Sequence, residues 1–221
     1  MDQKEIGRIF YRDGYRLASQ HLEVEVTVSN LKEAIRRLYK AIDGLLEAFL
    51  QRSASDGNPA ACKKGCSWCC HQEVFAVTHE ILYLQDHIQD YATPNERDAY
   101  ANRAREKSLL TLNKSVEEQI KVRSPCPFLV DGACSVYESR PMGCRIYLSS
   151  TVKSCEKDYK QPGNKWSIPE LYEFPLQAGR MLNEGFVAYL KQIGIGSSEI
   201  PLEQGYASVV SLNQTFKGWI G

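Results

Sequence analysis

Seven of the eight cysteines in the chain lie in two short tracts, one between residues 62 and 70 and the other between residues 126 and 144. They are Cys62, Cys66, Cys69, Cys70, Cys126, Cys134 and Cys144. Thiolates are soft ligands that favour zinc, copper(I) or iron–sulfur clusters. Spacings of two or three residues let neighbouring sulfur atoms converge on one ion, so this pattern predicts a metal site.

The spacing within the first tract limits which sulfur atoms can share an ion. On one turn of helix, Cys66 can share a face with Cys62, Cys69 or Cys70. The adjacent Cys69 and Cys70 cannot both face one centre without distortion of the backbone, so one of them should bind a second ion or pack as a small apolar side chain. Gly65 allows a positive φ and a close approach of amide groups to sulfur.

The second tract is rich in proline and glycine, which favour a rigid loop. Such rigidity suits metal ligands, because ordering a flexible backbone costs roughly 1–2 kcal/mol per residue. Four thiolates around Zn²⁺ carry a formal charge of −2. Arg140 and Arg145 are expected to offset this charge, whereas Lys63 and Lys64 fit solvated surface positions better.

The number of ligands leaves two interpretations open. Seven cysteines supply one site of four ligands with three left over, whereas eight ligands, counting Cys155 or His71, supply two sites. Cys155 has no partner at metal spacing, so it is either a ligand or a bystander. Trp68, between Cys66 and Cys69, is expected to shield the site from water.

The overall composition narrows the class of protein. Lys and Arg total 27 and so do Asp and Glu, which argues against general nucleic-acid binding. No stretch approaches the roughly 18 apolar residues of a membrane helix, and the sequence starts with charged residues rather than an apolar signal. These features predict a cytoplasmic protein without a membrane partner, where thiols stay reduced and bind metals rather than form disulfides.

Helical periodicity dominates the rest of the chain. The clearest amphipathic stripe runs from Leu31 to Phe49 and predicts a helix ending near Ser53. Gly7 and Gly14 weaken the pattern of an earlier helix. Thr78 can serve as the N-cap of a further helix that ends before Thr93, and a capping box opens another helix from Pro94 toward residue 122. Two more helices are predicted, from 169 to about 193 and from 202 to about 219. Short strands are predicted near 128–130 and 135–137.

We therefore predict a mainly α fold, a single bundle-like helical domain that holds irregular cysteine-rich metal-binding loops. Within it we distinguish an N-terminal helical segment, 1–58, a cysteine-cluster region, 59–160, and C-terminal helices, 161–221. Glu80, in the first turn of its predicted helix, is expected to interact with the helix dipole rather than with the metal.

The order of the motifs resembles a known family. The elements are Cys62-x3-Cys66-x2-Cys69-Cys70, Val77-Thr78-x-Glu80, Cys126-Pro-Phe-Leu129, Cys134-Ser-Val-Tyr137-Glu138 and Arg140-Pro-x-x-Cys144-Arg145. They resemble the CxxCxxCC, or YkgJ-type, family of zinc- or iron-chelating proteins, which is distantly like the flagellin lysine N-methylases. The resemblance covers roughly residues 60–150 and implies that all seven tract cysteines bind zinc or an iron centre.

Three functions follow from these observations. The first is a metal-binding protein that holds zinc or an iron–sulfur cluster. The second is an iron–sulfur enzyme or electron carrier with methylase-like or radical-type chemistry, although the sequence lacks a glycine-rich nucleotide loop and the strand–helix alternation of the radical enzymes' barrel. The third is a zinc-stabilised module that binds a protein partner. The sequence does not decide whether the chain is an enzyme.

Overall fold

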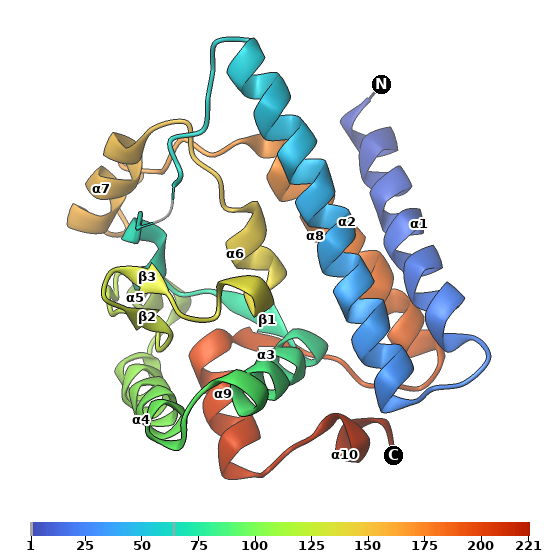
Figure 1. Cartoon of the computed structure of the whole chain (residues 1–221). Helices are drawn as coiled ribbons and strands as arrows, with labels where there is room; N and C mark the ends of the chain where they lie inside the picture. Colours follow the sequence, from blue (N-terminus) through green and yellow to red (C-terminus); the bar gives the residue numbers. More distant parts are fainter. Residues whose placement is uncertain (1, 64) are drawn as a thin grey trace.

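The computed structural model describes residues 2–63 and 65–221 and is mainly helical, as the sequence predicts (Figure 1). Its α-helices are α1 (Gln3–Leu22), α2 (Val28–Ser55), α3 (Thr78–Tyr91), α4 (Pro94–Thr111), α5 (Val116–Gln119), α6 (Met142–Ile146), α7 (Val152–Lys160), α8 (Glu173–Gln192), α9 (Leu202–Ser211) and α10 (Phe216–Ile220). Two 3₁₀ turns, η1 (Trp68–His71) and η2 (Tyr137–Ser139), lie between the α-helices of the cysteine-cluster region. The strands are β1 (Phe75–Val77), β2 (Leu129–Val130), β3 (Ala133–Cys134) and β4 (Glu199–Pro201).

Helices α1, α2 and α8 pack side by side and form one layer of the molecule (Figure 1). The predicted stripe of α2 is buried in this layer, with Leu31, Ile35 and Leu38 fully shielded from solvent. Thr27 begins α2 by accepting the backbone N–H of Asn30 at 3.1 Å. The helix ends at Ser55, two residues later than predicted.

The glycines of α1 have a packing role that the sequence pattern does not reveal. A Cβ atom at Gly14 would lie 1.9 Å from the carbonyl oxygen of Leu182, and one at Gly185 would lie 1.9 Å from the carbonyl oxygen of Tyr11. The two helices therefore touch backbone to backbone. These glycines permit the contact between α1 and α8 rather than weaken the helix.

The predicted capping box at Thr93 is confirmed. The Thr93 hydroxyl accepts from the Glu96 N–H at 3.4 Å, and the Glu96 carboxylate accepts from the Thr93 N–H at 2.8 Å. Thr78, by contrast, is not the N-cap of its helix. Its hydroxyl pairs with the backbone of Ser198, and the Glu80 carboxylate accepts the N–H of Val77 instead.

Two predicted helices are shorter than the sequence pattern suggests, because asparagines end them. Asn113 and Asn213 have φ values of 61° and 49°, a left-handed conformation that a helix cannot continue through. The predicted helix toward residue 122 thus divides into α4 and α5, and the one from 202 to about 219 divides into α9 and α10. Helix α8 begins at Glu173 rather than at 169, because Leu171 pairs with Ser149 in an isolated bridge.

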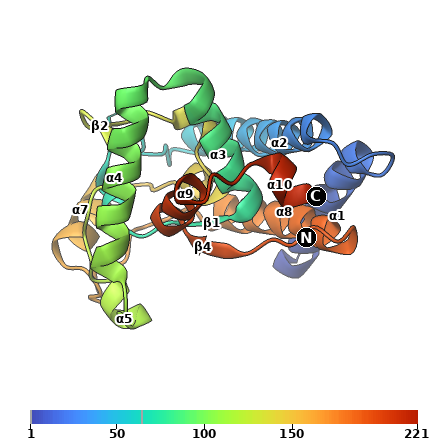
Figure 2. The same ribbon diagram turned by 90° about the horizontal axis from the view of Figure 1, so that it is seen from below.

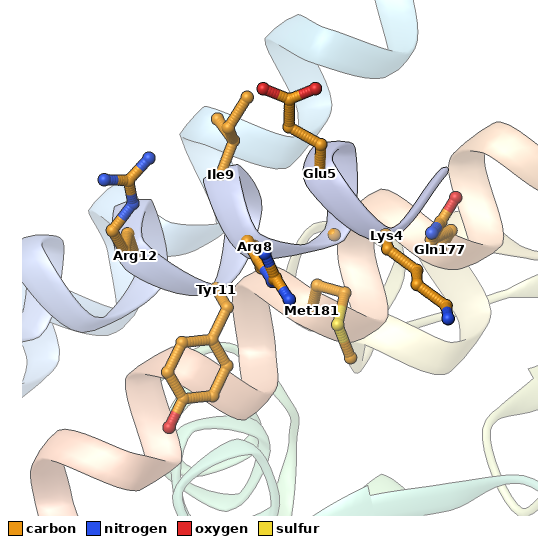
Figure 3. A pocket seen from close by; sticks show the side chains of 9 residues that line it. Lys4, Glu5, Arg8, Ile9, Tyr11, Arg12, Gln177 and Met181 are labelled. Atoms are coloured by element: carbon orange, nitrogen blue, oxygen red, sulfur yellow. The ribbon is translucent and has the colours of Figure 1, made fainter. Parts of the chain in front are cut away.

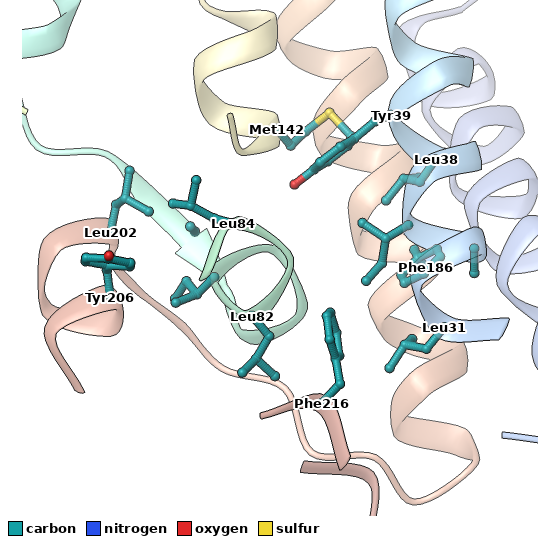
Figure 4. Packing of buried hydrophobic residues seen from close by; sticks show 14 of the residues in the cluster. Leu31, Leu38, Tyr39, Leu82, Leu84, Met142, Phe186, Leu202, Tyr206 and Phe216 are labelled. Atoms are coloured by element: carbon teal, nitrogen blue, oxygen red, sulfur yellow. The ribbon is translucent and has the colours of Figure 1, made fainter. Parts of the chain in front are cut away.

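Helices α3, α9 and α10 gather at one end of the layer, with α4 along the outer side of α9 (Figure 2). One cluster of buried apolar side chains connects these parts, and Figure 4 shows Leu38 of α2 beside Phe186 of α8 on one side of it and Leu84 of α3 beside Leu202 of α9 on the other. Strand β1 pairs antiparallel with β4, which ties the end of the first cysteine tract to α9. No helix among the described residues has the length and apolar character needed to cross a membrane.

Candidate metal centre

The first cysteine tract adopts an irregular path between α2 and β1 (Figure 1). Gly65 has a φ of 87°, which confirms the predicted positive value. The N–H of Cys66 donates to the carbonyl oxygen of Lys63 at 2.9 Å, and Cys69 and Cys70 follow in η1. Lys63 is exposed, as predicted, whereas Lys64 lies outside the described residues.

The second tract begins with a tight hairpin formed by β2 and β3. Asp131 and Gly132 form its turn with φ values of 49° and 76°. The backbone N–H of Phe128 acts against the effect of burial on the pKa of Cys126, and the N–H of Val136 does the same for Cys134. An N–H group that faces a sulfur stabilises the thiolate, so this local backbone is suited to a metal ligand.

The two tracts meet through their backbones. The N–H of Cys126 donates to the carbonyl oxygen of Cys70 at 2.6 Å, and the N–H of Ser124 donates to that of His71 at 3.0 Å. Residues separated by more than fifty positions therefore run side by side. Segments that the sequence treats as separate thus form one structural unit.

Helix α6 brings Cys144 to the same place. The Glu80 carboxylate accepts the Met142 N–H at 2.6 Å and so fixes the first turn of α6. On its other side α6 rests directly on α8, because a Cβ at Gly179 would lie 2.3 Å from the Ile146 side chain. Glu80 thus has a larger role than the predicted interaction with its own helix dipole, since it also positions the helix that carries a cysteine.

Four of the sulfur atoms influence each other's ionisation. Burial raises the pKa of Cys144 well above its usual value, and the neighbouring Cys126, Cys134 and Cys70 raise it further. Burial also raises the pKa of Cys134, with Cys70 adding to the effect. We call Cys70, Cys126, Cys134 and Cys144 the Cys70 set.

The remaining four cysteines form a second group in which the thiols again affect each other's pKa values. Burial raises the pKa of Cys62, and Cys66 and Cys155 raise it further, while the Ser149 N–H donates to the Cys62 sulfur at 3.3 Å. Cys155 reaches this position because α7 packs against η1, where the ring of Tyr159 contacts those of Trp68 and His71. We call Cys62, Cys66, Cys69 and Cys155 the Cys62 set.

Cys69 and Cys70 join the two sets. The Cys69 thiol donates a hydrogen bond to the Cys70 sulfur, which raises the pKa of Cys69 and lowers that of Cys70 to about 7. Cys62 and Cys144 both add to the upward shift in the pKa of Cys69. The prediction that one of these adjacent cysteines binds a second ion or packs as a small apolar side chain stays a prediction, as does the assignment of ligands.

All eight cysteines are free thiols and partly buried. Among the described residues, no three Cys, His, Asp or Glu side chains already stand in an arrangement that could hold a metal ion. The chemistry of the donors nevertheless fits a soft metal, because each set offers four thiols and the Cys62 sulfur accepts the backbone N–H of Ser149. The fit therefore lies in the type and grouping of the ligands.

Of the two arginines expected to offset the thiolate charge, one lies near the thiols and the other is buried in contacts elsewhere. Arg140 lies near the thiols, where its charge acts against the effect of burial on the pKa of Cys134 and Cys144. Arg145 instead binds the Asp43 carboxylate and two carbonyl oxygens and stacks on Tyr39. The expectation that Arg145 offsets thiolate charge is therefore not supported by its contacts.

A buried lysine near the thiols was missed from the sequence. Lys107 lies on the buried stripe of α4 together with Tyr100, Ala104 and Thr111. The sequence could have indicated it, because Lys107 falls on the buried face of the predicted helix and a lysine is rarely buried without a specific partner.

An open groove of about 870 Å³ lies elsewhere, between α1 and α8 (Figure 3). Lys4 and Arg12 lie toward its two ends, and Arg8, Tyr11 and Met181 line it between them. No cysteine contributes to this groove. It is therefore separate from the cysteine sets.

Comparisons with known proteins reach only the cysteine region. No curated protein and no solved structure matches the chain. A family model does match residues 61–166, and its description is CxxCxxCC, "putative zinc- or iron-chelating domain". This match spans every cysteine in the chain, so the segment of residues 61–166 is similar to the CxxCxxCC family.

Proposed function

We propose that the chain is a metal-binding protein with two centres, one held by the Cys70 set and one by the Cys62 set. The observation that supports it most strongly is the backbone pairing of Cys126 with Cys70, together with the effect of Cys70 on the pKa values of Cys126, Cys134 and Cys144. Residues from distant parts of the chain share this environment. A common inorganic partner gives a physical reason for it.

Each proposed centre has four thiolates, and this donor set suits zinc in a structural role. Structural zinc sites are closed by four ligands, commonly cysteines, whereas catalytic zinc sites keep one position open. Metal binding would then contribute directly to the folding of the two cysteine tracts, since these contain only 3₁₀ turns, two-residue strands and the short helix α6. We expect such a protein to reside in the cytoplasm with its thiols reduced.

An iron–sulfur protein is the second candidate, because four cysteines also ligate a 4Fe–4S cluster. The observation that favours it is the aromatic cover over η1, where Trp68 and His71 pack against Tyr159. Such a cover limits access of water and oxygen to a cluster in the Cys62 set. Zinc requires no protection from oxidation, so the cover would otherwise serve packing alone.

The test is elemental analysis and absorption spectroscopy of protein purified without oxygen. We expect two zinc ions per chain and no colour, and we expect Cys134→Ser and Cys66→Ser each to lose one ion while the other is retained. Brown protein that bleaches with dithionite would instead establish the iron–sulfur alternative. Protein without metal, or single variants that lose both ions or neither, would contradict two separate centres.

A further inference from the structure

Lys107 is almost entirely buried beside the Cys70 set. Its side chain is 5% exposed, and it lies where α4 packs against α9. An ammonium group removed from water is unfavourable unless opposite charge or hydrogen-bond acceptors compensate for the lost hydration. The neighbours of Lys107 therefore indicate what its charge stabilises.

The compensation from carboxylates is weak. The Glu203 carboxylate lies 3.7 Å from the Lys107 ammonium, which is longer than a hydrogen bond. Burial raises the pKa of Glu203 and so disfavours its negative charge, and the opposing effect of the Lys107 charge is smaller. One oxygen of Glu203 has no hydrogen-bond partner in the described part of the chain, and the same is true of one oxygen of the nearby Glu73. Glu203 alone is thus a poor counter-ion for Lys107.

The stronger contacts of Lys107 lead to the cysteines. Its ammonium donates to the carbonyl oxygen of Gln72 at 3.1 Å, two residues after Cys70. The Cys70 carbonyl in turn accepts the N–H of Cys126. Lys107 thus holds the backbone just after Cys70, at the point where the two cysteine tracts are paired.

We propose that Lys107 is the buried counter-charge of a metal centre in the Cys70 set. Four thiolates around a divalent ion carry a formal charge of −2, and an adjacent ammonium stabilises that charge in a poorly hydrated environment. Lys107 also holds the backbone that carries Cys70 through its bond to Gln72. This inference rests on the proposed function, because it assigns a partner to one of the two proposed centres.

The test is titration of Co²⁺ into metal-free, reduced protein that carries Cys66→Ser, so that only the Cys70 set can supply four thiolates. Thiolate-to-cobalt charge-transfer absorption reports binding. We expect Lys107→Met to lower the affinity about 10- to 100-fold, as loss of outer contacts to a metal site commonly does. Lys107→Arg should recover most of the affinity, and Lys114→Met, which removes an exposed charge, should have no effect.

Glu203→Gln separates an electrostatic role from a structural one. It removes negative charge but keeps Lys107, so we expect cobalt affinity at least equal to that of the Cys66→Ser parent. The combination Lys107→Met with Glu203→Gln removes the charges of both members of the buried pair, so neither is left facing an unpaired partner, and it should fold. It should still bind cobalt about tenfold or more weakly.

Two results would overturn the proposal. One is unchanged affinity in Lys107→Met; the other is equal weakening in Lys107→Met and Glu203→Gln, which would indicate that the pair only supports packing. A parent protein that binds no cobalt through thiolates would instead refute the proposed metal centre, whatever the variants do. Failure of this inference and failure of the proposed function are thus distinguishable.

Discussion

Buried polar side chains in this protein divide into those with partners and those without. His79, in the first turn of α3, is fully buried, and neither of its ring nitrogens makes a hydrogen bond within the described chain. Its ring packs against that of Phe186. Burial lowers the pKa of His79 to about 3, while the amide of Asn183 acts in the other direction. The neutral imidazole is therefore the form that the fold accepts.

This pKa predicts a loss of stability in mild acid. An unfolded histidine takes up a proton as the pH falls through about 6.5, whereas folded His79 does so only near pH 3. The contribution of neutral His79 to the free energy of unfolding is therefore complete above pH 6.5. It is lost progressively below that pH, by about 2 kcal/mol between pH 7 and pH 5. Urea unfolding at both pH values should show this loss in the unchanged protein and a correspondingly smaller loss in His79→Leu. Equal losses in the two proteins would contradict it.

At the scale of elements, two glutamates occupy equivalent positions in different surroundings. Glu80 and Glu96 are each the third residue of a helix, and each accepts the N–H of its N-cap residue. Glu96 is exposed, whereas Glu80 is buried and also receives the Met142 N–H and the Tyr39 hydroxyl. Glu80 therefore connects α3, α6 and α2, whereas Glu96 serves only its own helix.

Replacing Glu80 should consequently destabilise the protein far more than replacing Glu96. Glu80→Ala leaves the buried N–H groups of Val77 and Met142 without acceptors, so we expect a loss of about 3 kcal/mol in the free energy of unfolding. Glu96→Ala should have a much smaller effect, because water can replace its carboxylate. Denaturant unfolding measures both, and comparable losses would mean that Glu80 is only a helix cap.

The same scale shows what sequence periodicity can and cannot predict. The stripe of α2 and the capping box of α4 are local, and both are confirmed. The ends of α4 and α9 could have been read from Asn113 and Asn213, since asparagine tolerates a left-handed conformation. The proximity of Cys155 to Cys62 depends on the packing of α7 against η1, which no local pattern contains. Local order was thus predictable, and the grouping of the thiols was not.

For the whole molecule, the contact between α1 and α8 has no side chains between the two backbones at Gly14 and Gly185. From the sequence alone, Gly14 only weakens a helical pattern, because the reason for it lies in a helix about 170 residues away. Gly44 offers a natural comparison. It is exposed on α2, and nothing lies within 4 Å of the position its Cβ would take.

Replacement by alanine should therefore lower the free energy of unfolding at Gly14 and Gly185 and raise it at Gly44. Gly14→Ala and Gly185→Ala should each destabilise the protein by about 3 kcal/mol, because a Cβ forces the helices apart. Gly44→Ala should stabilise it by up to about 1 kcal/mol through the higher helix propensity of alanine. Thermal unfolding of the three variants measures the difference. A stable Gly14→Ala protein would show that α1 can shift without cost.

Helix α6 is confined between α8, at Gly179, and the backbone of β1, where a Cβ at Gly143 would lie 3.3 Å from the Phe75 carbonyl oxygen. Cys144 consequently has little freedom to approach an incoming ion. The hairpin of β2 and β3 ends in an exposed tip at Asp131 and Gly132. If the Cys70 set binds an ion, Cys144 would thus act as the fixed reference point that sets where the ion lies.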